Sequence, residues 1–187
     1  LGWLQNAVCF DSAKTVHALR HSRIAQDGGR TVIVHTAQEA PKAQVEEPRP
    51  KIVLADFEGT DYGDWTVTGE AFGKGPAHGT LANQQNVSGF LGEGLVNTFL
   101  DGDQPHGTLV SPAFEINRKY VNFLIGGGSH ADETCINLLV GDKVVRTAAG
   151  KDNEKLEWRF WNVEDLQGKS ATIQIVDRNS GAWGHIN

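Results

Sequence analysis

Six residues in the last third of the chain have side chains that could together recognise a sugar. A planar guanidinium such as that of Arg146 can hold two vicinal hydroxyl groups, and a carboxylate such as that of Asp177 can accept hydrogen bonds from them. The indole of Trp183 would offer an apolar plate to the ring carbons. The full candidate set consists of His130, Asn137, Arg146, Asp177, Trp183 and His185.

Each of these residues also has an ordinary structural interpretation, which the sequence leaves open. Arg146 could pair with a surface acid. Asp177 is in phase with Ile173 and Ile175, so it could be a buried residue that bonds a loop backbone. Trp183 could be a core side chain that closes one end of the sheet. Only the grouping of the six residues indicates a ligand site.

Short strands must position these side chains, because apolar and polar residues alternate in brief runs between turn clusters. The 22 glycines of the chain suit many tight turns. Strand patterns do not alternate with helical patterns along the chain, which argues against a parallel α/β fold. The sequence therefore predicts an all-β, antiparallel β-sandwich of the jelly-roll type. Its strands are expected at residues 51–57, 65–68, 94–99, 107–111, 114–116, 120–125, 134–140, 143–148, 156–163 and 171–176.

One hairpin can be built in register from the sequence. The loop at residues 140–143 has glycine at its first central position, as a type II′ turn prefers. The register that follows pairs Leu138 with Val145 and Asn137 with Arg146. Asn137 and Arg146 are therefore expected to be neighbours on a mixed face, which would meet water or line a shallow ligand groove.

The chain is expected to have three parts. Residues 1–36 form a small, irregular N-terminal segment of unknown role, with a short helix expected at 13–20 and a strand at 31–34. Residues 37–50 are rich in proline and glutamate and read as a linker. Residues 51–187 form the sandwich module.

Two groups of side chains invite a metal-binding interpretation. His17 and His21 are four residues apart, as on one helix face, and His35 follows them. No HExxH pattern surrounds these histidines, which favours an exposed polar face. A second group, before Trp65, is acidic. A solvated turn is the first interpretation of that group, a structural calcium site the second and glycosidic catalysis the third. Its members are Asp56, Glu58, Asp61 and Asp64.

Composition and motifs narrow the other classes of function. The net charge of −6 argues against a partner of nucleic acid or an anionic membrane. Cys9 and Cys135 lie in different predicted units, so no disulfide is implied. The sequence contains no nucleophile elbow and no phosphate-binding loop followed by a helix, so no cofactor is expected. The glycines at 126–128 lie between two strands, which is typical of close backbone approach.

Several motifs of residues 51–187 together resemble the accessory β-sandwich domain attached to glycoside hydrolase family 32 enzymes, which include levanases and inulinases. They are ADFEGTDYGDWTVTGEAFG, GLVNTFLDGD, GTLVSPAFEI, YVNFLIGGGSH, TCINLLVGDKVVRTAAG, LEWRFWNVEDLQGK and IVDRNSGAWGHIN. This chain has Gly181-Ala182 before Trp183, where the family usually has two glycines. The family sandwich normally continues a little further than Asn187, so the module is expected to be a truncated piece of a longer protein.

The resemblance implies a non-catalytic module of a secreted, periplasmic or cell-surface enzyme that degrades fructan. Its expected partners are β-fructan, such as levan or inulin, or terminal fructose, together with a neighbouring five-bladed β-propeller domain that carries catalysis. The propeller's catalytic motifs are not found in these 187 residues, so no catalytic residue is assigned. The alternative is a purely structural domain that braces the propeller without binding sugar.

Overall fold

The computed structural model describes residues 21–27, 30–36 and 49–187 and divides the chain into two compact units, Leu1–Lys51 and Ile52–Asn187. In the first unit, β1 (His21–Asp27) pairs antiparallel with β2 (Arg30–Thr36). The predicted strand at 31–34 lies within β2. The predicted helix at 13–20 and His17 fall outside the described residues. His21 begins a strand, which contradicts its expected place on a helix face.

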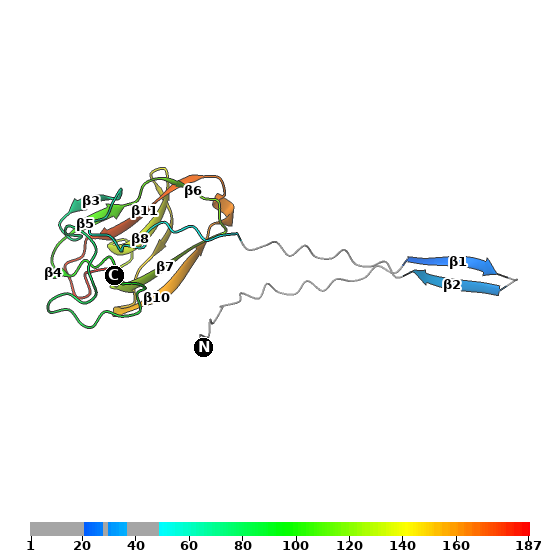
Figure 1. Ribbon diagram of the computed structural model, residues 1–187, viewed down its shortest axis with the longest axis horizontal. Helices are drawn as coiled ribbons and strands as arrows, with labels where there is room; N and C mark the ends of the chain where they lie inside the picture. Colours follow the sequence, from blue (N-terminus) through cyan, green and yellow to red (C-terminus); the bar gives the residue numbers. More distant parts are fainter. Residues whose placement is uncertain (1–20, 28–29, 37–48) are drawn as a thin grey trace. The chain divides into compact units, whose positions relative to one another are not determined.

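The regular structure of the second unit consists of antiparallel strands and one 3-10 turn, joined by long irregular segments. Its larger sheet has six strands in the order β3-β5-β11-β8-β9, with β6 also paired to β11, and its smaller sheet pairs β7 with β10 (Figure 1). This arrangement confirms the predicted all-β sandwich. No helix of the described residues is long and apolar enough to cross a membrane. The elements are β3 (Thr66–Gly69), β4 (Leu100–Asp103), β5 (Gly107–Val110), β6 (Phe114–Glu115), β7 (Tyr120–Gly127), β8 (Thr134–Val140), β9 (Lys143–Ala148), β10 (Asn153–Asn162), the 3-10 turn η1 (Glu164–Leu166) and β11 (Ser170–Asp177).

The hydrophobic core lies between the two sheets. Alternate residues of each strand point inward, so Leu138 of β8 and Ile173 of β11 join Ile125 of β7 and Trp161 of β10 in one buried cluster. A second, smaller cluster of Val87, Leu95 and Leu156 lies beside it, with Phe90 and Leu124 packed against it. Along residues 158–162 of β10, the positions in phase with Trp161 therefore face inward and those between them face outward. A register shift between Asn153 and Glu157 reverses this earlier in the strand, where Glu154 and Leu156 are buried.

Two predicted strands are wrong. Residues 51–57 form no strand, and Ile52, Val53 and Leu54 are exposed. The run at 94–99 is buried but irregular: Leu95 exchanges backbone hydrogen bonds with Ala77, and the Thr98 amide donates to the Ile186 carbonyl at 3.1 Å. The apolar run at 94–99 therefore indicated burial correctly, but these residues do not form a continuous strand.

The β8–β9 hairpin closes as predicted but is out of the predicted register beyond its first pairs. Val140 pairs with Lys143, and Gly141 takes a φ of 60°. A bulge then opposes Leu138 to Arg146 and Asn137 to Thr147. The predicted pairing of Asn137 with Arg146 is therefore wrong, because one extra residue on β9 changes the partner of every residue after it.

Candidate functional site

The six predicted residues lie in three different places. His130, Asp177, Trp183 and His185 are associated with residues 178–187, which we call the C-terminal loop. Asn137 lies in the larger sheet, where its amide donates to Gln174 Oε1 at 3.4 Å and its side chain is 7% exposed. Arg146 lies beside the end of β10 and η1, because it bonds Asn162 and Asp165. The short 3-10 turn η1, drawn in orange, lies at the other end of the sandwich from the C-terminus (Figure 1). Four of the six candidates therefore lie around the C-terminal loop, and the other two lie elsewhere.

The backbone of the C-terminal loop packs against the end of β7. The Gly128 amide donates to the His185 carbonyl at 2.8 Å, and the Gly126 amide donates to the Asn187 carbonyl at 2.9 Å. A Cβ on Gly127, whose φ is +84°, would lie 2.5 Å from the His185 carbonyl oxygen. The glycines at 126–128 thus permit the close backbone approach that the sequence indicated.

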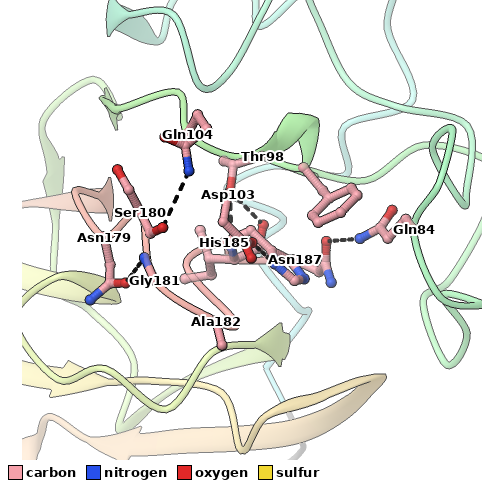
Figure 2. A network of polar contacts seen from close by, with 12 residues as sticks. Gln84, Thr98, Asp103, Gln104, Asn179, Ser180, Gly181, Ala182, His185 and Asn187 are labelled. Atoms are coloured by element: carbon pink, nitrogen blue, oxygen red, sulfur yellow. Dashed lines mark hydrogen bonds and ion pairs between the residues drawn. The ribbon is translucent and has the colours of Figure 1, made fainter.

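Three histidine side chains hold this loop. His106 Nε2 lies 2.7 Å from Ser180 Oγ, and His130 Nε2 lies 2.9 Å from the Ala182 carbonyl oxygen, to which it can donate. The third, His185, belongs to the loop itself and points back into the sandwich, where its side chain is 3% exposed (Figure 2). The loop is therefore fixed from the β4–β5 connection, from the β7–β8 connection and from the interior.

The ring of His185 lies between two carboxylates. Its Nδ1 is 2.7 Å from Asp103 Oδ1, and its Nε2 is 3.2 Å from Glu154 Oε1. An imidazole donates from both nitrogens only when it is protonated. Burial lowers the pKa of His185, but the hydrogen bonds and charges of Glu154 and Asp103 outweigh burial and raise this pKa above its ordinary value. The arrangement is a clamp between β4, β10 and the C-terminal loop, and the raised pKa favours its protonated form.

Further amides complete the network around Glu154, which is 6% exposed. Asn187 Nδ2 donates to Glu154 Oε2 at 2.6 Å, and Gln84 Nε2 donates to the same oxygen at 3.1 Å. Asn97 Nδ2 in turn donates to Gln84 Oε1 at 2.8 Å. Both carboxylate oxygens of Glu154 are thus satisfied by protein groups, which is what a buried carboxylate requires.

Asp177 differs from Glu154, because neither of its carboxylate oxygens has a hydrogen-bond partner although the residue is 1% exposed. Burial raises the pKa of Asp177 to about 6. The neighbouring Thr98 hydroxyl, the Asn179 amide and nearby histidine charges act in the opposite direction without overcoming burial. The Thr98 hydroxyl donates instead to the Ile186 carbonyl at 3.3 Å. Asp177 is buried as its phase suggested, and the backbone amide of Asn179 in the loop is close enough to act on its carboxylate.

Trp183 covers the clamp. Its indole stacks on the His185 ring with centroids 5.8 Å apart and planes 27° from parallel, and Phe99 meets the same imidazole edge-on at 4.9 Å. The Trp183 backbone has a left-handed φ of 61°, and a Cβ on Gly184 would lie 2.3 Å from the Asn179 carbonyl oxygen. Because one face of the indole is already occupied, the interpretation of Trp183 as a closing side chain fits this geometry.

Arg146 lines a shallow cavity, wide open to solvent, of about 450 Å³ together with Asn162, Glu164 and Asp165. Its Nη2 donates to Asp165 Oδ1 at 2.6 Å, and its Nε and Nη2 donate to the Asn162 carbonyl at 3.2 and 3.1 Å. The hydrogen bond from Arg146 lowers the pKa of Asp165. The guanidinium is therefore held in one orientation at the edge of a solvent-open space.

The structure also shows an aromatic surface that the sequence did not single out. Trp158 and Phe160 of β10 are 62% and 67% exposed, and Tyr120 of β7 is 44% exposed. The strand 153–162 carries aromatic residues on both faces, since Trp161 is buried between the exposed positions. The sequence signal was the adjacent pair Phe160-Trp161, because two neighbouring aromatic residues in a strand cannot both face the core. We call Tyr120, Trp158 and Phe160, with Asn122 and Asn162 between them, the aromatic face.

The acidic turn before Trp65 makes backbone hydrogen bonds. Asp56 Oδ1 accepts from the Glu58 amide at 3.2 Å, and Asp61 Oδ1 accepts from the Gly63 amide at 2.9 Å. Glu58 reaches across to accept from the Glu93 amide at 3.1 Å. Within the described part of the chain, no group of three histidine, cysteine or acidic side chains is placed to hold a metal ion. These contacts fit the turn interpretation of the acidic stretch.

The fold and these contacts define a β-sandwich with a clamped polar end and an open aromatic face. In sequence, the chain is similar to "Putative glycosyl hydrolase ecdE" of Aspergillus rugulosus, with 43% identity over 143 residues. The match covers 75% of this chain and 20% of that protein, so the chain spans about a fifth of the length of the curated relative it matches. No family model and no solved structure matches the chain. The sequence is thus related to a protein described as a glycosyl hydrolase.

Proposed function

We propose that residues 51–187 form a non-catalytic carbohydrate-binding module of a secreted, fructan-degrading glycoside hydrolase of family 32. The module binds or positions β-fructan, such as levan or inulin, next to a catalytic propeller domain. The similarity to a glycosyl hydrolase supports a carbohydrate-related role. Motifs such as YVNFLIGGGSH and IVDRNSGAWGHIN resemble the family 32 accessory sandwich. This resemblance supports fructan as the ligand.

The observation that carries this proposal is the open cavity at Arg146. Its lining combines one guanidinium with the carboxylates of Glu164 and Asp165, each of which has a side chain 62% exposed. Arg146 already donates from Nε, Nη1 and Nη2 to protein oxygens, which fixes its guanidinium in place. Its remaining N–H and the two exposed carboxylates are the donor and acceptors that a neutral polyhydroxy ligand could meet. A purely anionic ligand would face two carboxylates, and a cation would face Arg146. The cavity therefore suits a sugar.

Calorimetric titration of the full chain with fructose, inulin and levan tests this proposal. Binding of at least one of them is expected. Arg146→Ala should weaken that binding by roughly tenfold or more, because charge-assisted hydrogen bonds to the ligand are lost. Lys151→Ala, which removes an exposed ion pair with Glu157 away from the cavity, is the matched control and should bind like the parent. The absence of heat with all three ligands would overturn the proposal.

The second candidate function is structural bracing of a neighbouring domain, and the C-terminal loop favours it. The predicted ligand residues Trp183 and His185 are engaged with one another and with protein carboxylates. If the module only braces, Trp183→Ala should reduce the stability or expression of the parent enzyme and leave its fructan affinity unchanged. The two candidates are therefore separated by whether fructan affinity responds to Arg146→Ala.

A further inference from the structure

We propose that the aromatic face binds a polysaccharide chain that continues outward from the Arg146 cavity, so that the module recognises several consecutive sugar units. This inference rests on the proposed function and adds to it a second binding surface and the length of the ligand. It assigns Trp158, Phe160 and Tyr120 as the residues that contact the additional sugar rings.

The exposure of these three side chains is the first observation. Trp158 and Phe160 are two residues apart on β10, and alternation places both on the outer side of the smaller sheet. The Phe160 ring meets the Tyr120 ring edge-on, with centroids 5.7 Å apart. Exposed aromatic rings on a strand give apolar plates of the kind that the carbon-bound face of a sugar ring can cover.

Carboxamides alternate with the aromatic rings, which is the second observation. The register of β7 and β10 places Phe160 opposite Asn122 and Tyr120 opposite Asn162. Directly opposed side chains lie on the same face of a sheet. Each of these two rings therefore has an amide beside it. Asn162 Oδ1 already accepts from the Glu164 amide at 2.9 Å, so Asn162 offers its NH₂ group as a donor. A sugar ring, apolar on one side and edged with hydroxyl groups, needs both kinds of neighbour.

The aromatic face is continuous with the cavity. Asn162 belongs to both, and Tyr120 is its cross-strand partner. Lys119 joins the same two places, because its Nζ lies 3.1 Å from Glu164 Oε2 and 5.7 Å from the centre of the Tyr120 ring. From Trp158 to Asn162 the strand advances about 14 Å, at about 3.4 Å per residue. A ligand that fills the cavity and follows β10 would be longer than one sugar unit.

The dimensions of the face favour a sugar chain over a protein partner. The two strands offer three outward positions each, from Trp158 to Asn162 on β10 and from Tyr120 to Leu124 on β7. At the Leu124 end, the small cluster of Val87, Leu95 and Leu156 borders the face. A standard protein interface takes about 20–30 residues from each side. The aromatic face is much smaller than that, and amides interrupt it.

Calorimetry with β-fructan oligosaccharides of increasing length tests the inference on the full chain. Affinity should rise from fructose to longer oligosaccharides, and tryptophan fluorescence should change on binding. Trp158→Ala and Phe160→Ala should leave the affinity for fructose unchanged and weaken binding of the long ligands by roughly tenfold. Leu91→Ala, which removes an exposed apolar side chain that is not part of the aromatic face, is the control and should match the parent.

The outcomes separate the two proposals. If no carbohydrate binds, the proposed function and this inference both fail. If fructose binds but affinity does not grow with length, or if Trp158→Ala and Phe160→Ala leave long ligands unaffected, only the inference fails. It also fails if these variants change self-association in sedimentation, or attachment to the remainder of the parent enzyme, while sugar affinity stays constant. Both positions are exposed, so unchanged thermal unfolding should confirm that the variants fold.

Discussion

His185 Nδ1 lies 2.7 Å from Asp103 Oδ1, across 82 residues of sequence, and this contact fixes the C-terminal loop to β4. The opposite ring nitrogen meets Glu154 at 3.2 Å. A neutral imidazole would turn one lone pair towards a carboxylate oxygen, so the clamp depends on the proton. The pH dependence of the module's stability should therefore reflect the contacts of His185 with Asp103 and Glu154.

Stability contributed by His185 should be lost as the solution becomes alkaline. The folded-state pKa of His185 is raised above the ordinary value of 6.5. The folded state therefore holds its proton to higher pH than the unfolded state does. The contribution is fully present below about pH 6.5 and declines as the pH rises through the folded-state pKa. Denaturant unfolding between pH 6 and 9, with an NMR titration of the ring, measures this. A His185→Gln variant should lose that slope, and a folded-state pKa at or below 6.5 would contradict the prediction.

Asp177 should make the free energy of unfolding depend on pH in a different, more acidic range. Its pKa is raised from 3.8 to about 6, so the folded state binds the proton more strongly and stability falls as the pH rises from about 4 to about 6. The difference of about two pKa units corresponds to a cost of at most about 3 kcal/mol at neutral pH. Asp177→Asn should therefore stabilise the folded state at pH 7 and flatten the slope in that window.

The matched control for this substitution is Asp142→Asn, which changes an exposed carboxylate in the β8–β9 loop and should leave stability within about 0.5 kcal/mol. Unfolding by urea at several pH values measures the free energy of unfolding of both variants. A destabilised Asp177→Asn protein at pH 7 would show that the carboxylate makes a favourable contact in solution, contrary to its environment in this fold.

The core should respond strongly to a cavity in β8. Leu138 is fully buried between the sheets, and Leu138→Ala should cost about 2–5 kcal/mol of unfolding free energy. Val144→Ala on β9 removes a side chain that is 45% exposed and should cost less than about 1 kcal/mol. Equal losses for the two variants would mean that the side chains of β8 do not face the core as described.

Gly184 should tolerate no side chain. A Cβ there would lie 2.3 Å from the Asn179 carbonyl oxygen and 2.8 Å from that of Gly181, so Gly184→Ala must displace the loop. Loss of the clamp should then appear as faster amide hydrogen exchange in the C-terminal loop, while exchange in β8 is unchanged. Identical exchange in the loop of the variant and the parent would contradict this packing.

Sequence reasoning succeeded where the signal was local. The predicted strands at 134–140 and 143–148 coincide with β8 and β9, since alternation and a Gly-Asp turn determine them over a few residues. The bulge opposite Leu138 has no local signature, and it moved Arg146 away from Asn137. This is why a correctly placed hairpin still led to an incorrect neighbour.

The candidate site was only partly predictable for a similar reason. His185 and Trp183 could be grouped because they are close in sequence, and they do lie together. Asp103 and Glu154 were missed because they reach His185 only through the packing of β4 and β10. A single acidic residue in a strand carries no mark of a partner that lies far along the chain.

The hydrogen bonds of Asn187 connect segments of the module that lie far apart in the sequence. Asn187 donates to Glu154 and lies 3.5 Å from Gln84 Nε2, a residue 103 positions earlier. The carboxylate of Glu154 is therefore fully covered only while residue 187 is in place. Proteolytic removal of Asn187 would leave a charged, wet opening at this polar end.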